Sequence, residues 1–584
     1  MKQISTKQWW YLIITVAVIW FSNLEYRILI KPDEGRYAEI PREMVASGDW
    51  TTPRLNDIKY FEKPPLQYWA TAVAYEVFGE HQWTSRLWAG LTGFFGIFLV
   101  WFAGLRLFGR EAAAYSAMLL GSSLLYVLIG HVNTLDMGVT FFISLGIFAF
   151  LIAQGESAVK VQRNWMLLAW AGMALAVLSK GLMGIILPGT AIFIYCIAQR
   201  DFSVLKRMHW LAGLTVFFLI TAPWFYFVMK ANPEFFDKFF IYEHYTRFTT
   251  KQHGRYQPWY YFVPILLSGA LPWTLLMLDT LCCTWRDSKL PVRPERSAAK
   301  SKGEFDESLS RPSTSPSVLS IVEGSGRTES IFNPARFLLI WAVFIYLFFT
   351  ASGSKLPSYL LPIFPALALL MGKRITEMSS QTLFKQIVPV ILFVIAIMVL
   401  ALNVGKLADT PLQKELYPQY TSWLMVASLV LLAGLLGGLW LLRNERKQIA
   451  VATLACSSLL FAQIGLSGYN ELAVERSAKH IALAIAPQLK AGVPFYSVLD
   501  YEQTLPFYLK RTFTLVQYQD EMGFGLGQEP QRWIPTVEEF APVWAAQTEA
   551  YAIIRVHDYP RMQQLGLSMQ IIFQDSQNIV VKKL

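Results

Sequence analysis

The sequence predicts an α-helical protein that crosses a membrane many times and ends in a small α/β domain. Three observations predict this fold class. Of the 584 residues, 54% are hydrophobic and only 16% are charged, whereas soluble proteins carry about a quarter charged residues. Apolar stretches of membrane-spanning character recur between residues 9 and 467. After residue 468 the pattern changes to short runs rich in β-branched and aromatic residues, separated by helical stretches.

About 13 apolar stretches are candidate membrane helices of a polytopic bundle. They lie near residues 9–24, 84–105, 112–130, 134–153, 165–179, 182–198, 210–229, 258–282, 336–352, 358–371, 383–402, 421–442 and 449–467. Several are short and would need tilt or a locally thinned bilayer to cross alone. The first stretch lacks a small-residue cleavage site after it, which predicts an uncleaved signal anchor.

The distribution of basic residues predicts the orientation of the bundle. Lysine and arginine collect in alternate loops, and such loops stay on the cytoplasmic side. This places the amino terminus in the cytoplasm and, with an odd number of spans, the carboxyl-terminal domain in the periplasm of a bacterial inner membrane. Basic loops facing anionic lipid account for the net charge of +10, so no nucleic-acid partner is expected.

Composition divides the chain into regions. Residues 1–467 form the predicted membrane domain, in which residues 28–80 are a long first outer loop. Residues 287–334 are rich in serine, proline and charge, which predicts a disordered cytoplasmic insertion. Residues 468–584 form the predicted periplasmic α/β domain. Within it, the glycine-rich segment 523–527 is predicted to be a flexible turn rather than a nucleotide site.

The first outer loop carries an unusual density of charge for a membrane protein. Its two parts read Lys31-Pro-Asp-Glu-Gly-Arg-Tyr-Ala-Glu-Ile-Pro-Arg-Glu-Met44 and Lys59-Tyr-Phe-Glu-Lys-Pro-Pro65. Residues 36–46 and 66–77 are amphipathic and follow prolines, which predicts two short helices in the membrane interface. Asp33 and Glu34 would stand at the positive end of the first helix. A carboxylate there is stabilised in its charged form and can act as a base or bind a cation, although ordinary helix-start charges are the alternative.

Polar residues also collect in the other loops that the predicted topology places outside. They are Asp136, the segment Ser179-Lys-Gly181, Glu243, His244, Arg247, Lys355 and Tyr359. Because these loops mix carboxylates with bases and tyrosines, while the inner loops are simply basic, we expect the functional groups to gather at one membrane face.

Several of these residues also have a plainer structural interpretation. Lys63 could extend to the lipid headgroups, although its neighbours Glu62 and Tyr60 favour an anion-binding role. Glu243, His244 and Arg247 would lie on one helical face by their i, i+1, i+4 spacing, and that face could simply be solvated. Glu62 and His244 supply one oxygen and one nitrogen ligand for a divalent metal such as zinc, magnesium or manganese. Two ligands without a characteristic spacing are weak grounds for a metal site.

The motifs together resemble a known family. The segments are Asp33-Glu-Gly-Arg-Tyr-Ala-Glu-Ile-Pro-Arg-Glu-Met44, Ser47-Gly-Asp-Trp50, Tyr60-Phe-Glu-Lys-Pro64, Glu243-His-Tyr-Thr-Arg247, Gly269-Ala-Leu-Pro-Trp273 and Lys355-Leu-Pro-Ser-Tyr359. They resemble the dolichyl-phosphate-mannose–protein mannosyltransferase-like family of GT-C glycosyltransferases, and within it the bacterial lipid A aminoarabinose transferases. The order of a membrane domain followed by a small periplasmic domain is also similar.

This resemblance implies an inverting transfer of a sugar from undecaprenyl (polyprenyl) phosphate to an acceptor at the periplasmic membrane face. Within the family it implies transfer of 4-amino-4-deoxy-L-arabinose to lipid A. By position, the resemblance implies that Asp33 is the catalytic carboxylate and Asp136 a second acidic site residue. It implies that Lys63 and Arg247 bind the carrier phosphate, that Tyr60 and Tyr359 line the pocket, and that Glu62 and His244 can hold a metal. From their positions in the sequence, Glu34 is a further catalytic candidate and Lys355 a further candidate for binding the carrier phosphate or sugar.

Alternatives to this function stay open at the level of sequence. Gly35 and the insertion at 287–334 depart from the aminoarabinose transferase pattern, which leaves the sugar and the acceptor undecided. Transfer of another lipid-linked sugar, such as a hexose, to protein or to a surface glycan is one alternative, and a polysaccharide polymerase or ligase is another. A lipid-substrate transporter or flippase is remote, because transporters hold polar groups near the bilayer midplane within paired repeats.

Overall fold

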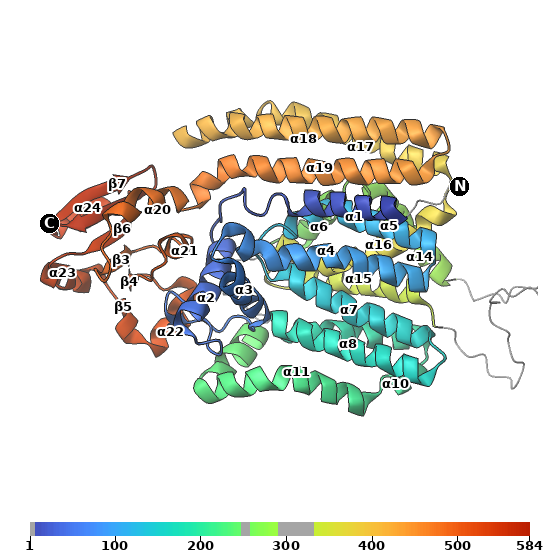
Figure 1. Cartoon of the computed structure of the whole chain (residues 1–584), viewed down its shortest axis with the longest axis horizontal. Coiled ribbons are helices and arrows are strands. Elements are labelled where there is room, and N and C mark those ends of the chain that lie inside the picture. The colour runs from blue at the N-terminus through green and yellow to red at the C-terminus, as the bar shows by residue number, and fades with distance from the viewer. Residues whose placement is uncertain (1–5, 247–256, 290–331) are drawn as a thin grey trace, which may run out of the picture.

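A computed structural model describes residues 6–246, 257–289 and 332–584 (Figure 1). A bundle of long helices occupies most of the molecule, and a small sheet domain stands at one end of it. The first loop, with helices α2 (Asp33–Ser47) and α3 (Leu66–Phe78), lies between the two. The predicted fold class, a polytopic helical protein with a carboxyl-terminal α/β domain, is confirmed.

The bundle places a helix on each of the apolar stretches predicted from the sequence. These helices are α1 (Thr6–Phe21), α4 (Gln82–Leu107), α5 (Arg110–Ser122), α6 (Leu124–Ile129), α7 (Asp136–Gly155), α8 (Val159–Lys180), α9 (Met183–Gln199), α11 (Trp210–Ala231), α13 (Phe262–Gly269), α14 (Thr274–Lys289), α15 (Pro334–Ala351), α16 (Phe364–Glu377), α17 (Ser380–Ala401), α18 (Pro411–Arg443) and α19 (Lys447–Ala473).

Not every one of these helices is long enough to span a bilayer by itself. Within the described residues, 8 helices pass on length and apolarity, or up to 9 if the pair α13 and α14, bent by 112°, forms one span. The chain is therefore a multi-pass membrane protein, and the count of about 13 spans stays a prediction.

The first loop folds as the amphipathic pattern predicts. Pro32 and Pro65 stand directly before α2 and α3, where their fixed φ and missing N–H do no harm to a helix start. Between the helices, β1 (Arg54–Leu55) and β2 (Ile58–Lys59) form a small hairpin. Although α2 is rich in charge, residues 34–44 are buried, because the bundle and the sheet domain cover it from both sides.

The carboxyl-terminal domain is built on a mixed six-stranded sheet. The strands are β3 (Phe495–Val498), β4 (Thr514–Val516), β5 (Trp533–Ile534), β6 (Tyr551–Arg555), β7 (Met569–Gln574) and β8 (Asn578–Lys583), in the order β5-β4-β3-β6-β8-β7. The first four in that order are parallel, and β8 pairs antiparallel with both its neighbours. Helices α20 (Lys479–Ile485), α21 (Leu505–Leu509), α22 (Gly523–Gln528), α23 (Val537–Ala546) and α24 (Tyr559–Gln564) complete the domain.

Two predictions about the segments differ from the structure, and one lies largely outside it. Helix α19 continues through the predicted domain boundary at residue 467 to Ala473. The glycine-rich segment 523–527 is not a flexible turn but forms α22. A Cβ on Gly525 would stand 2.3 Å from the carbonyl oxygen of Lys59, so this glycine allows the helix to press on the β1–β2 hairpin. Most of the predicted disordered insertion, residues 290–331, lies outside the described residues.

Candidate active site

A cavity of about 350 Å³ opens at the end of the bundle nearest the sheet domain. Its charged wall is formed by Asp33, Arg36, Glu62, Lys63, Asp136, Lys180 and Glu243. Its apolar wall is formed by Leu182, Met183, Ile186, Leu187, Phe348 and Phe349. The lining residues come from each of the loops that the sequence predicted to be outer, so the structure brings these separate motifs to one place.

Asp33 is the acidic residue of α2 that faces this cavity. Its side chain is 41% exposed, and its Oδ1 lies 3.1 Å from Nη2 of Arg36, one turn further along the helix. Arg36 itself is only 2% exposed, and its Nη1 donates to the hydroxyl of Tyr60 at 2.7 Å. Burial raises the pKa of the Tyr60 hydroxyl, so this group stays a neutral partner of the guanidinium. The Asp33 carboxylate is thus in contact with Arg36 through Oδ1 and is also exposed to the cavity.

A second charged pair lines the same cavity. Asp136, the first residue of α7, forms an ion pair with Lys180, the last residue of α8. The ammonium of Lys180 also lies 4.9 Å from the centre of the Tyr359 ring, within the range of a cation–π contact. Tyr359 packs in turn on Phe349, with ring centres 5.0 Å apart. This wall therefore offers a cation, a carboxylate and an aromatic face to a bound molecule.

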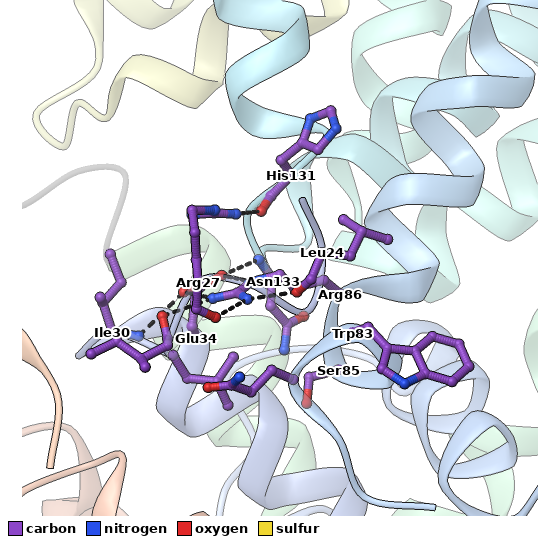
Figure 2. A network of polar contacts seen from close by, with 12 residues as sticks. Leu24, Arg27, Ile30, Glu34, Trp83, Ser85, Arg86, His131 and Asn133 are labelled. Atoms are coloured by element: carbon purple, nitrogen blue, oxygen red, sulfur yellow. Dashed lines mark hydrogen bonds and ion pairs between the residues drawn. The ribbon is translucent and has the colours of Figure 1, made fainter. Parts of the chain in front are cut away.

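Glu34 differs from its neighbour Asp33, because it faces the protein interior (Figure 2). It is 1% exposed and binds Arg86 of α4 through two contacts of 2.7 and 2.8 Å. Its oxygens also accept the backbone N–H groups of Ile30 and Asn133. Burial alone would raise the pKa of Glu34, but the ion pair with Arg86 holds that pKa below its usual value. This buried position favours a structural role, in which Glu34 anchors the start of α2, over the predicted catalytic one.

Arg86 extends the anchor beyond Glu34. Its guanidinium also donates to the carbonyl oxygens of Leu24, Arg27 and Ile28, and Arg27 donates to the carbonyl of His131. These contacts connect the chain just after α1 to α4 and to the segment before α7. The first loop is therefore held by a buried network at the point where the site begins.

The remaining expected site residues lie in different places. Tyr60 contacts Arg36 and does not line the cavity. Lys355 donates a hydrogen bond of 2.8 Å to the carbonyl oxygen of Gln257, while its neighbours Ser354 and Leu356 line the cavity. Arg247 lies outside the described residues, and of His244 only the backbone, in the helix η1 (Asp237–Thr246), is described.

The structure also adds residues that the sequence did not assign to the site. Arg36 and Lys180 were visible as parts of the motifs Asp33–Met44 and Ser179–Gly181, but their pairing with acidic residues was not. Glu521, from the carboxyl-terminal domain, lies with its Oε2 2.8 Å from Nη1 of Arg36. No local signal in the sequence marks Glu521, because its role depends on how the two domains pack.

The donor set for a metal is incomplete in the described part of the chain. Glu62 lines the cavity, but no group of three or more histidine, cysteine, aspartate or glutamate side chains among the described residues could hold an ion. Structural and catalytic zinc sites use at least three protein ligands. The metal therefore stays a prediction.

Comparisons with known proteins agree on one family. Residues 62–227 match the family described as dolichyl-phosphate-mannose-protein mannosyltransferase, and residues 481–583 match the aminoarabinose transferase C-terminal domain. The crystal structure of ArnT from Cupriavidus metallidurans bound to undecaprenyl phosphate superposes with a TM-score of 0.88 and 34% identity, covering 99% of both chains. In the apo state the same protein gives a TM-score of 0.86.

Curated relatives are named as arabinosyl transferases. An undecaprenyl phosphate-alpha-4-amino-4-deoxy-L-arabinose arabinosyl transferase of Erwinia tasmaniensis is 34% identical over 373 residues, which is 63% of this chain and 60% of the relative. The corresponding transferase 1 of Proteus mirabilis is 30% identical over 380 residues, 64% of this chain and 60% of the relative. The match thus spans about 60% of the length of these relatives.

The multi-helix membrane domain, the amphiphilic cavity at one end of it and the sheet domain beyond that end give this chain the fold of the GT-C class of membrane proteins. Within that class, the chain belongs to the aminoarabinose transferase (ArnT) family.

Proposed function

We propose that this protein transfers 4-amino-4-deoxy-L-arabinose from undecaprenyl phosphate to lipid A. We place the site at the periplasmic face of the bacterial inner membrane, with the amino terminus in the cytoplasm and the sheet domain in the periplasm. The observation that carries the proposal is the cavity, which has one charged wall and one apolar wall beside membrane helices. A lipid-linked sugar phosphate has the same two-sided chemistry, and the family relatives are named for this substrate.

The apolar wall supports a lipid carrier. Leu182, Met183, Ile186 and Leu187 belong to the start of α9, and Phe348 and Phe349 to the end of α15. A cavity of about 350 Å³ suits the headgroup and the first carbon units of such a carrier, because small-molecule sites usually measure about 300–1,000 Å³. The rest of the polyprenyl tail would extend into the surrounding lipid.

The charged wall supports the chemical step. The bond between the anomeric carbon and the carrier phosphate oxygen breaks, and its electron pair leaves with undecaprenyl phosphate. Lys63 and Arg247 would stabilise the developing negative charge as preorganised cations in a partly dry site. An oxygen of the acceptor phosphate supplies the electron pair of the new bond, so a single displacement with inversion needs no covalent intermediate.

The role of Asp33 depends on the acceptor. An ionised lipid A phosphate has no proton to lose, so Asp33 would orient the acceptor or a cationic group of the donor. A hydroxyl acceptor, as in transfer of a hexose to protein or to a surface glycan, would require Asp33 to take up the proton. The identity of the acceptor is therefore the point at which the two functions separate.

The test is transfer by the purified protein in nanodiscs, supplied with undecaprenyl phosphate–aminoarabinose and lipid A, with product detection by mass spectrometry. We expect aminoarabinose-modified lipid A with the native protein and none with Asp33→Asn. Asp49→Asn is a matched control, because Asp49 lies in the same loop but only caps the N–H groups of Thr51 and Thr52. Unmodified lipid A in the presence of the native protein would remove the assignment.

The same assay addresses the metal. If Glu62 and His244 hold a divalent ion, a chelator should lower transfer by the native protein and added zinc, magnesium or manganese should restore it. Glu62→Gln should then be insensitive to the chelator. Full activity of the native protein after exhaustive chelation would discard the metal.

A further inference from the structure

The carboxyl-terminal domain contacts Arg36 of the active site through Glu521. One oxygen of this carboxylate, Oε2, lies 2.8 Å from Nη1 of Arg36, and the other, Oε1, accepts a hydrogen bond of 2.7 Å from the amide of Gln503. On its other side, Arg36 places Nη2 3.1 Å from Oδ1 of Asp33. Contacts therefore run without a gap from the sheet domain through Gln503, Glu521 and Arg36 to the carboxylate in the cavity.

Exposure decides which member of this chain of contacts can meet a substrate. Arg36 is 2% exposed and Glu521 is 12% exposed, whereas Asp33 is 41% exposed. Nε and Nη2 of Arg36 are also shut off from solvent. Arg36 is held between two carboxylates and a tyrosine hydroxyl, so it cannot turn towards the cavity without giving up charged contacts. The guanidinium therefore acts through Asp33.

We propose that Glu521 is a positioning residue for sugar transfer, which holds Arg36 in the orientation that fixes the Asp33 carboxylate in the cavity. The inference rests on the proposed function, and it makes the sheet domain a part of the catalytic unit. A misplacement of a reacting group by about 1 Å can cost about a hundredfold in rate, so a support of this kind affects turnover directly.

Gly35 makes the contact between the two domains close enough for this support. A Cβ at position 35 would stand 2.6 Å from the backbone carbonyl oxygen of Gln503 and 2.9 Å from the backbone nitrogen of Thr504. Any larger residue would push this segment away from α2, and Gln503 is the residue that orients Glu521. Gly35 thus allows the close approach of Gln503, and Gln503 in turn holds the Glu521 carboxylate that contacts Arg36.

Docking of the sheet domain does not depend on Glu521 alone. Arg54 on the β1–β2 hairpin contacts Glu529 at 3.0 Å, and Lys31 contacts Glu502 at 2.6 Å. Because the pair of Arg54 and Glu529 joins the same two parts of the chain without lining the cavity, it is a matched control for loss of an interdomain ion pair.

The experiment measures kcat and the donor KM in the nanodisc transfer assay for Glu521→Gln, Arg36→Gln, the double variant and Glu529→Gln. It is run at pH 8, because burial raises the pKa of Glu521 to about 7 and the native carboxylate is charged above that pH. We expect Glu521→Gln to lower kcat by about tenfold, equivalent to about 1.4 kcal/mol of barrier, with the donor KM within about twofold of the native value. The double variant should be no slower than Arg36→Gln, because Glu521 acts through Arg36. Glu529→Gln should keep kcat within about twofold.

Three results overturn the inference: an unchanged kcat in Glu521→Gln, an additive loss in the double variant, or an equal loss in Glu529→Gln. If Arg36→Gln does not fold, Gly35→Ala takes its place, and we expect it to lower kcat with little change in KM. Native protein that transfers no sugar overturns the proposed function instead. Active native protein with an unaffected Glu521→Gln overturns only the positioning role.

Discussion

The buried ion pair between Glu34 and Arg86 makes a quantitative prediction about the first loop. Both side chains are almost without exposure, at 1% and 0%, and they share two contacts of 2.7 and 2.8 Å. Glu34→Gln keeps the shape of the side chain but leaves the Arg86 charge buried without its counter-charge. Loss of one partner of a buried pair costs about 3–5 kcal/mol, so we expect Glu34→Gln to lower the free energy of unfolding by about 3 kcal/mol.

The measurement is unfolding of the purified protein by SDS in mixed micelles, followed by tryptophan fluorescence. Glu76→Gln is the control, because Glu76 is an exposed residue of α3, and it should stay within about 0.5 kcal/mol of the native protein. The double variant Glu34→Gln with Arg86→Gln should be less destabilised than the sum of the two single changes, because no charge is left unpaired. Native stability of Glu34→Gln, or simple additivity, would refute a structural role of the pair.

Three further predictions concern the cavity and the interface between the domains. Lys63→Met should lower kcat/KM for the lipid-linked donor by about a hundredfold, because it removes a cation at the leaving phosphate. Steady-state kinetics in nanodiscs measure this ratio, and an unchanged value would contradict the prediction. Burial raises the pKa of Glu521 to about 7. Between about pH 4.5 and pH 7 the folded protein therefore keeps the Glu521 carboxyl protonated, whereas the unfolded chain loses that proton. The free energy of unfolding falls as the pH rises through this window, by at most about 1.4 kcal/mol per pH unit. Glu521→Gln should therefore gain stability relative to the native protein between pH 5 and pH 8, and an identical pH dependence of the two unfolding curves would count against the buried carboxylate. Gly525→Val should loosen the sheet domain from the β1–β2 hairpin, because its Cβ would meet the Lys59 carbonyl at 2.3 Å, and limited proteolysis should release the domain faster than in the native protein.

Much of the fold could be predicted because hydrophobicity and charge are local properties of a membrane protein sequence. Each apolar stretch coincides with a helix, and the amphipathic segments 36–46 and 66–77 coincide with α2 and α3. The carboxyl-terminal region also folds as the α/β domain that its short β-rich runs and helical stretches predicted. The prediction for the glycine-rich segment 523–527 was wrong, because the segment is helical and Gly525 allows a close contact with the β1–β2 hairpin rather than a turn.

The sequence by itself determined that this is a multi-pass membrane protein with charged groups gathered in alternate loops, since both depend on residue type along the chain. Only the tertiary structure decided which charge does what. Asp33 and Glu34 carry the same local signal, but successive residues of an α-helix point about 100° apart, so one faces the cavity and the other the interior. Two residues outside α2 make this difference between the carboxylates possible. Arg86 binds the buried carboxylate of Glu34, and Glu521 contacts Arg36, which lies beside the exposed carboxylate of Asp33.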